Sequence, residues 1–187
     1  MSLVDTEVLM EEIARLRGQV AQLEARCAEL DRDAHLDTLV PVANRRGLIR
    51  QLELLIARRQ RHSVPAALLF VDVDGLKDLN DSFGHAAGDA ALIYLARMMV
   101  DQVRLSDLVA RLGGDEFAVL LDHADEAAAM DIANRLVNAV ADSDFTHNGQ
   151  TLPLSIAIGI TAIEKDDSAE AVLDRADREM YRDKAAA

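Results

Sequence analysis

The feature that most constrains the fold of this chain is a pair of glycines between two apolar runs. Gly113 and Gly114 follow the run LVARL, and Asp115 and Glu116 then lead into the run FAVLL. Because glycine tolerates the positive φ of a tight turn, this pattern predicts a β-hairpin. Its tip carries two carboxylates beside bare backbone, as a metal-bound phosphate would need. The residues also allow a simpler interpretation, an acidic and solvated turn.

A second segment places carboxylates at the end of a predicted strand. Residues 66–71 are apolar and fit a buried central strand, which ends in Asp72-Val73-Asp74. Since side chains alternate along a strand, Asp72 and Asp74 should share one face, with Val73 opposite. Ligand sites form at the carboxyl ends of strands in α/β sheets, and Mg²⁺ takes carboxylate and phosphate oxygens. An acidic strand end that caps the next helix is the alternative.

The two segments carry chemistry together only if their ends meet. If Asp72 and Asp115 converge, their repulsion is about 4 kcal/mol at a separation of ~4 Å and an effective dielectric constant of ~20. A divalent cation between them would relieve this repulsion. The metal-site interpretation therefore depends on the convergence of two β-segments that are distant in the sequence.

With both motifs present in this order, the chain resembles the GGDEF-domain diguanylate cyclases, which make cyclic di-GMP from two GTP molecules. The resemblance covers residues 37–184. The signature at residues 113–117 is intact, and so is the spaced pattern DVDGLKDLNDSFGHAAGD at residues 72–89. Two long motifs in the right order make the resemblance specific.

The resemblance implies roles for the acidic residues. Asp72, Asp115 and Glu116 correspond to the catalytic carboxylates. Asp72 and Asp115 match the residues that bind Mg²⁺, or Mn²⁺ in its place, with the Val73 carbonyl as a further ligand. Glu116 matches a residue tied to metal binding or to activation of the 3′-hydroxyl.

Six further positions match residues that bind substrate in the family: Asn80, Asp89, Lys77, Lys184, Gly113 and Gly114. Asn80 and Asp89 correspond to guanine readers, because a carboxylate accepts two N–H bonds from the guanine edge while an amide both donates and accepts. The two lysines correspond to point charges on the triphosphate, and the glycines let the backbone approach it. Taken singly, each residue has a structural alternative, such as a helix end or a solvated lysine.

The resemblance implies a product with two-fold symmetry and one GTP held by each domain, so two domains would have to face each other. A heptad pattern offers the means of pairing, with leucines at position d and β-branched or small residues at position a: Leu9, Leu16, Leu23 and Leu30; Ile13, Val20, Cys27 and Ala34. This pattern favours a parallel two-stranded coiled coil and hence a homodimer. We expect residues 1–36 to form this signalling helix and residues 37–187 the catalytic domain. An amphipathic helix packed on its own domain is the alternative.

A short charged motif precedes the hairpin. Arg104 and Asp107 have the RxxD form, five residues before Leu112. Together with Arg135 on a later helix, they resemble the family's inhibitory site for cyclic di-GMP, where arginine suits phosphate and guanine edges. A salt bridge at a helix end is the simpler interpretation.

The remaining pattern predicts an α+β fold with a sheet of about five strands, partly antiparallel, flanked by helices. The resemblance implies the palm-like sheet of nucleotidyl cyclases. We expect a bulge or bend at Gly159, inside a β run over residues 152–163. Helices are expected after Arg45, near Leu76, and over residues 86–103, 126–141 and 169–184.

Composition sets limits on partners and location. A net charge of −13 argues against nonspecific binding to nucleic acid or to acidic membranes. One cysteine fits a reducing cytoplasm, and no run approaches the ~18 apolar residues of a membrane span. We therefore expect a cytoplasmic protein whose partners are GTP, cyclic di-GMP and a second copy of the chain.

Two departures from the family qualify this expectation. The opening motif has Val40 and Pro41 where the family has Thr and Gly, and the sequence ends at Ala187 without the Gly-Arg-Asn and final strand that usually follow. Loss of that arginine predicts weaker GTP affinity. The competing functions are a cyclic di-GMP receptor, a coiled-coil interaction protein, and a palm-domain polymerase or another nucleotidyl cyclase. The intact signature argues against a degenerate receptor, and Asn80 and Asp89 argue against an adenylyl cyclase.

Overall fold

The computed structural model describes residues 3–186. The chain divides into two units, Met1–His35 and Leu36–Ala187. The first unit consists of helix α1, Leu3–Asp33. Among the side chains of α1 that the structure describes, the apolar ones are exposed, including Leu16, Leu23 and Val20, whereas the side chain of Leu9 lies outside the described residues. Along the described chain, no helix has the length and apolar character that a bilayer crossing requires.

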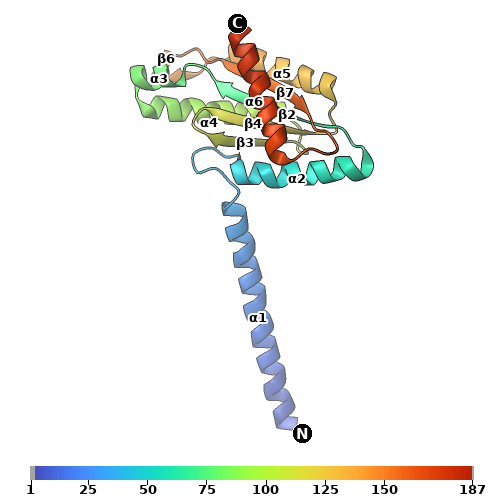
Figure 1. Ribbon diagram of the computed structural model, residues 1–187. Helices are drawn as coiled ribbons and strands as arrows, with labels where there is room; N and C mark the ends of the chain where they lie inside the picture. Colours follow the sequence, from blue (N-terminus) through green and yellow to red (C-terminus); the bar gives the residue numbers. More distant parts are fainter. Residues whose placement is uncertain (1–2, 187) are drawn as a thin grey trace. The chain divides into compact units, whose positions relative to one another are not determined.

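The second unit is built on a mixed sheet (Figure 1). Within residues 36–186, five strands form this sheet in the order β1-β3-β4-β2-β7, and only the β1–β3 pair is parallel. The strands are β1 Ala43–Asn44, β2 Ala66–Val73, β3 Leu108–Gly113, β4 Glu116–Asp122 and β7 Ile156–Ala162. A short ribbon, β5 Thr146–His147 and β6 Gln150–Thr151, lies apart from it. The predicted α+β class is confirmed.

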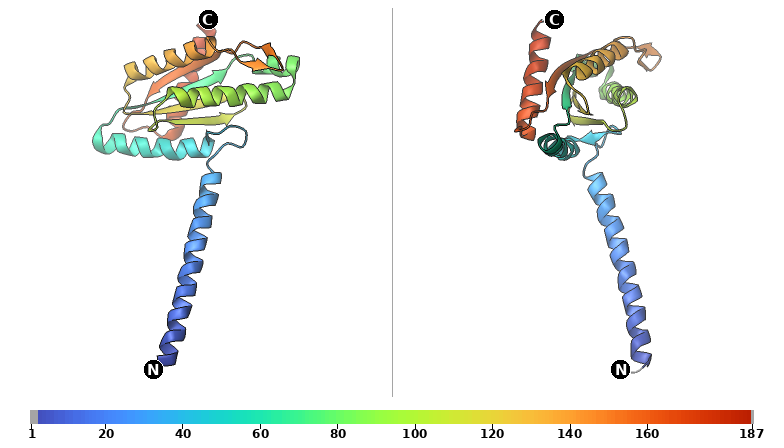
Figure 2. Two further views of the ribbon diagram at one scale, coloured as in Figure 1. Left: turned by 180° about the vertical axis from the view of Figure 1, so that it is seen from behind. Right: turned by 90° about the vertical axis from the view of Figure 1, so that its right-hand side faces the viewer.

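Helices cover both faces of the sheet (Figure 2). Helices α2, Arg45–His62, and α6, Ala169–Ala186, lie on one face, while α4, His85–Gln102, and α5, Glu126–Ala141, lie on the other. The short helix α3, Leu76–Phe83, follows β2 and packs against α4. Side-chain caps fix two of these helices, since Asn44 accepts from the N–H of Gly47 and Asp125 from that of Ala128.

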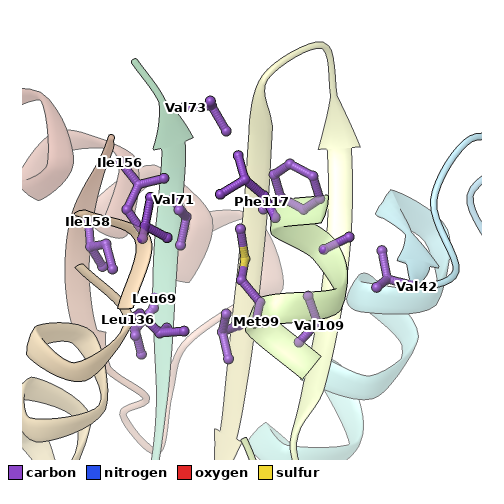
Figure 3. Packing of buried hydrophobic residues seen from close by; sticks show 14 of the residues in the cluster. Val42, Leu69, Val71, Val73, Met99, Val109, Phe117, Leu136, Ile156 and Ile158 are labelled. Carbon is purple, nitrogen blue, oxygen red and sulfur yellow. The ribbon is translucent and has the colours of Figure 1, made fainter. Parts of the chain in front are cut away.

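Alternation along β2 divides the core in two. Leu69, Val71 and Val73 enter the cluster beneath α4 and α5, where Figure 3 shows them beside Phe117, Met99 and Leu136. Leu68 and Phe70 enter the second cluster, beneath α2 and α6. Since side chains on a strand point alternately to the two faces, the next residue of this second series, Asp72, points toward α2 and α6.

The β run near the C-terminus differs from its prediction. Only residues 156–162 of the expected 152–163 join the sheet, and residues 150–151 belong to the small ribbon. The expected bulge at Gly159 is wrong, because the ladder between β2 and β7 runs without a register shift and pairs Gly159 with Phe70. The bend, which is the other expectation for this residue, stays a prediction. The glycine serves close packing. A Cβ atom there would lie 2.2 Å from the carbonyl oxygen of Ala176 in α6.

The connection from β7 to α6 is secured by Arg175. Its guanidinium donates to the Ala162 carbonyl (2.7 Å), to the Thr161 hydroxyl and to both carboxylate oxygens of Asp167 (3.0 and 2.7 Å). The hydrogen bonds from Arg175 lower the pKa of Asp167 despite its partial burial. These contacts fix the start of α6, the helix whose last turn carries Lys184.

Candidate active site

The register between β2 and β4 brings two acidic residues side by side. Asp72 lies directly opposite Glu116, and residues paired in this way point to the same face of a sheet. The backbone N–H of Val73 donates to the carbonyl of Asp115 at 3.0 Å. The ends of the two strands therefore meet, and Asp72, Asp115 and Glu116 gather at one edge of the sheet. The Val73 side chain is buried on the opposite face.

The Gly-Gly turn adopts the backbone that only glycine adopts readily. Gly113 has a φ of 149° and Gly114 a φ of 53°, and both lie in the positive region. A Cβ atom at either position would meet no heavy atom within 4 Å, so the backbone is open to an approaching group. The hairpin predicted from the sequence is present, with a register shift between Arg111 and Gly113.

Arg111 braces this turn from one side. Its Nε and Nη2 donate to the Gly114 carbonyl at 3.1 and 2.7 Å, and its Nη1 lies 3.4 Å from Oδ1 of Asp37. Asp37 also accepts the N–H groups of Leu39 and Val40 at 2.9 and 3.0 Å. The turn is thus tied to the segment that opens the domain. Val40, which stands where the family has threonine, still holds this segment in place, because its backbone N–H and not its side chain bonds to Asp37.

Negative charge accumulates around Glu116. Partial burial raises the pKa of Glu116, and the carboxylates of Asp115, Asp177 and Asp72 raise it further, against a smaller lowering by Arg45. Sequence reasoning missed Asp177 and Arg45. A signal for Asp177 was available, because it precedes Lys184 by seven residues, or two helical turns, and so shares its face of α6.

Lys184 lies on the acidic edge. Its ammonium bonds to Oδ1 of Asp72 and lies 3.1 Å from Oδ1 of Asp74. Burial acts to lower the pKa of Lys184, but the hydrogen bonds to Asp72 and Asp74 outweigh it and raise the pKa. Asp74 does not cap α3, whose N-cap is Gly75 without a side-chain bond. Instead Asp74 accepts a bond from the hydroxyl of Ser155 at 3.1 Å.

The expected guanine readers and the second lysine lie on α3 and α4. The Asn80 side chain lies against Gly88, where an added Cβ atom would come within 2.1 Å of its Oδ1. The packing of α3 on α4 therefore places Asn80 against the residue that precedes Asp89. Asp89 and Lys77 are exposed.

The acidic edge suits a hard cation chemically. Among the side chains that the structure describes, no group of three His, Cys, Asp or Glu is arranged as a ready metal cage. The edge nevertheless offers carboxylate oxygens from Asp72, Asp115 and Glu116, and the pKa of Glu116 is raised by partial burial and then by repulsion from the neighbouring carboxylates. Mg²⁺ is typically bound by one or two carboxylates together with substrate phosphates. The phosphate oxygens of a bound nucleotide would therefore supply the remaining ligands of such a site.

The RxxD segment forms a closed turn. The N–H of Asp107 donates to the Arg104 carbonyl at 2.9 Å, and the Asp107 carboxylate accepts the N–H groups of Arg104 and Asp122 at 3.0 and 3.1 Å. Arg135 of α5 donates to the side chain and carbonyl of Gln102 at 3.1 and 2.6 Å. All three predicted inhibitory residues therefore lie around the end of α4.

Comparison with known proteins shows to which family this chain is similar. The profile described as "Diguanylate cyclase, GGDEF domain" matches residues 34–187. Diguanylate cyclase DgcP of Pseudomonas aeruginosa is 35% identical over 180 residues, covering 96% of this chain and 27% of that protein. Diguanylate cyclase TpbB of the same species is 38% identical over 179 residues, covering 95% and 40%. The chain thus spans well under half the length of these relatives.

Solved structures agree with this assignment. The GGDEF domain of TpbB from Pseudomonas aeruginosa has a TM-score of 0.74 at 39% identity, covering 78% of this chain and 92% of that one. The coiled coil and GGDEF domain of DgcB from Caulobacter crescentus, in complex with c-di-GMP, has a TM-score of 0.85 at 23% identity, covering 95% of each chain, which shows a shared fold. The chain belongs to the GGDEF family of diguanylate cyclase domains.

Proposed function

We propose that this chain is a diguanylate cyclase that condenses two GTP molecules into cyclic di-GMP and two pyrophosphates. The observation that carries the proposal is the pairing of Asp72 with Glu116 beside the open backbone of Gly113 and Gly114. Relatives named diguanylate cyclases support the same activity.

To catalyse this reaction, the protein mainly has to position the two GTP molecules and stabilise the charge on their phosphates. The 3′-oxygen of one GTP attacks the α-phosphorus of the other, the hydroxyl proton leaves, and the bond to the β-phosphate breaks to release pyrophosphate. Repeating the step in the opposite sense closes the ring. Holding two reactants in line removes a large entropic barrier, so each domain must present its GTP to the other.

We assign the site residues the roles that the family resemblance implies and that their chemistry allows. Asn80 and Asp89 bind the guanine edge, Lys77 and Lys184 contact the phosphates, and Glu116 accepts the hydroxyl proton or helps to hold the metal. A divalent cation, held by Asp72, Asp115, Glu116 and the Val73 carbonyl, would neutralise charge on the phosphates. Mg²⁺ fits these oxygen donors, and Mn²⁺ would serve in its place.

The product of a single incubation tests the proposal. The protein is mixed with Mg²⁺ and GTP, and the nucleotides are separated and identified by mass. We expect cyclic di-GMP together with pyrophosphate. Binding of added cyclic di-GMP without any turnover would instead indicate a receptor, and a linear polynucleotide would indicate a polymerase.

In this proposal, two copies of the chain dimerise through helix α1. Its seam residues include Ile13 and Leu23, which are 45% and 65% exposed on the isolated chain. Exposed apolar residues at a and d positions favour burial against a second copy of the helix. The structural relative DgcB is described with a coiled coil beside its GGDEF domain, which supports the same arrangement here.

Breaking the seam is expected to separate the dimer and reduce cyclisation. The substitution Leu23→Glu puts a charge at a d position, while Gln22→Glu makes the same charge change on the outer face. Light scattering should give a monomer for Leu23→Glu, with activity per molecule at least tenfold lower at micromolar protein, because both half-sites are needed. Gln22→Glu should stay dimeric and active. A dimeric Leu23→Glu protein would contradict the coiled coil.

Product inhibition is the regulatory part of the proposal. Arg104, Asp107 and Arg135 surround one end of α4, where an arginine fork suits phosphate oxygens. The substitution Arg104→Ala is expected to raise the cyclic di-GMP concentration for half-inhibition by at least about tenfold, as loss of a charge-assisted bond of ~1.5–3 kcal/mol implies. Initial rates with added product measure it. Arg97→Ala, which removes an exposed arginine on α4, is the control. Unchanged inhibition of Arg104→Ala would refute the site.

A further inference from the structure

Asp74 lies between a serine and the ammonium of Lys184. Its Oδ2 accepts the Ser155 hydroxyl at 3.1 Å, and its Oδ1 lies 3.1 Å from Nζ of Lys184. The backbone N–H of Asp74 donates to the Ser155 carbonyl at 3.0 Å. Each carboxylate oxygen therefore has its own partner, and Asp74 is joined to Ser155 through both backbone and side chain. The position of this carboxylate is fixed by the segments that end β2 and precede β7.

We infer that Asp74 and Ser155 are positioning residues that hold the Lys184 ammonium at the substrate phosphates when a divalent cation engages Asp72. The inference rests on the proposed function, because it concerns the same GTP site. It adds two residues to that site for which sequence reasoning gave no role in catalysis or binding.

Lys184 needs a second anchor because its ammonium is shared between two carboxylates. Lys184 bridges Asp72 and Asp74, and a cation bound to Asp72 repels the lysine from the first of these carboxylates. A lysine side chain has a flexible four-carbon stem, so without a second anchor it would move into solvent. Asp74 is that anchor, and Ser155 orients it as outer residues orient the ligands of a metal.

The sign of one substitution separates this role from a plain charge effect. Replacing Asp74 by asparagine removes a negative charge close to the expected triphosphate. By charge alone, the loss should tighten the binding of a polyanion. If Asp74 instead holds Lys184 in place, the loss should weaken binding. The two explanations therefore predict changes in opposite directions.

The experiment is a calorimetric titration with a GTP analogue that cannot cyclise, in which a methylene replaces the oxygen between the α- and β-phosphates. In the presence of Mg²⁺, we expect Asp74→Asn to bind it about fivefold more weakly than the parent, the scale of a partly exposed ion pair. Asp131→Asn removes the same charge from an exposed position on α5 and should bind like the parent. In a Lys184→Met background, Asp74→Asn should cause no further weakening.

Ser155→Ala provides a second variant that keeps every charge. It should weaken binding in the same direction by a smaller factor, and circular dichroism checks that both variants are folded. Equal or tighter binding by Asp74→Asn would overturn the inference. A loss that persists in the Lys184→Met background would overturn it as well, because Asp74 would then act directly on the metal. If the parent itself binds no analogue, the proposed function fails with it, whereas a binding parent and an unaffected Asp74→Asn reject the inference alone.

Discussion

The substitution Glu116→Gln is expected to abolish cyclic di-GMP synthesis while leaving the fold intact. Glutamine has nearly the same shape, but it cannot accept the hydroxyl proton and it lacks the charge that attracts a divalent cation. Loss of a positioned acid or base costs a factor on the order of 10²–10⁴, and weaker metal binding adds to it. Mass detection of cyclic di-GMP over a long incubation with Mg²⁺ and GTP measures the residual rate. Synthesis at the parent rate would refute the assignment.

Thermal unfolding tests whether Glu116→Gln is folded, and the change in its melting temperature should depend on pH in a defined direction. Burial and the neighbouring carboxylates raise the pKa of Glu116 above its usual 4.5. Above pH 4.5 the unfolded state releases this proton more readily than the folded state, so stability falls as pH rises through the folded pKa. Glu116→Gln should therefore melt at a higher temperature than the parent at pH 7 in metal-free buffer. The difference should vanish below pH 4.5, where both states are protonated.

Gly159→Ala is expected to produce the largest loss of stability. The added methyl group would lie 2.2 Å from the Ala176 carbonyl oxygen and 2.3 Å from the Met180 nitrogen. Both atoms belong to the backbone of α6, so relief requires moving the whole helix. Overpacking of this kind costs about 3 kcal/mol, which lowers the melting temperature by about 6–12 °C. Thermal unfolding followed by circular dichroism measures it.

The same variant connects packing to activity. Helix α6 carries Lys184, whose ammonium reaches Asp72, so displacement of the helix should also weaken GTP binding. Gly18→Ala is the matched control, because a Cβ atom there meets nothing within 4 Å and alanine favours a helix. An unchanged melting temperature for Gly159→Ala would mean that α6 does not pack on β7 as closely as described.

The sequence was informative where local rules suffice. The hairpin at Gly113 and Gly114 follows from the requirement for positive φ, and the helix over residues 126–141 was predicted with its observed bounds. The five-stranded α+β sheet also followed from the pattern of elements. Gly159 misled the prediction, because a glycine within a strand signals either a bulge or a close approach, and only the position of α6 distinguishes the two.

Some residues around the site had weak signals or none. Arg111 and Asp37 are far apart in the sequence, yet the parallel pairing of β1 with β3 brings their segments together. Ser155 meets Asp74 only because β7 pairs with β2. Such contacts depend on strand order and register, which no short window of sequence encodes.

The sequence by itself determined which chemical groups this protein carries, because turn-forming glycines, alternating strands and paired carboxylates are local features. The tertiary structure alone decided which groups meet. The antiparallel register puts Asp72 opposite Glu116, and α6 brings Lys184 from the far end of the chain to both Asp72 and Asp74. The physical reason is that burial of the two apolar faces of the sheet selects the strand order and helix positions, and the polar ends of the elements come together as a consequence.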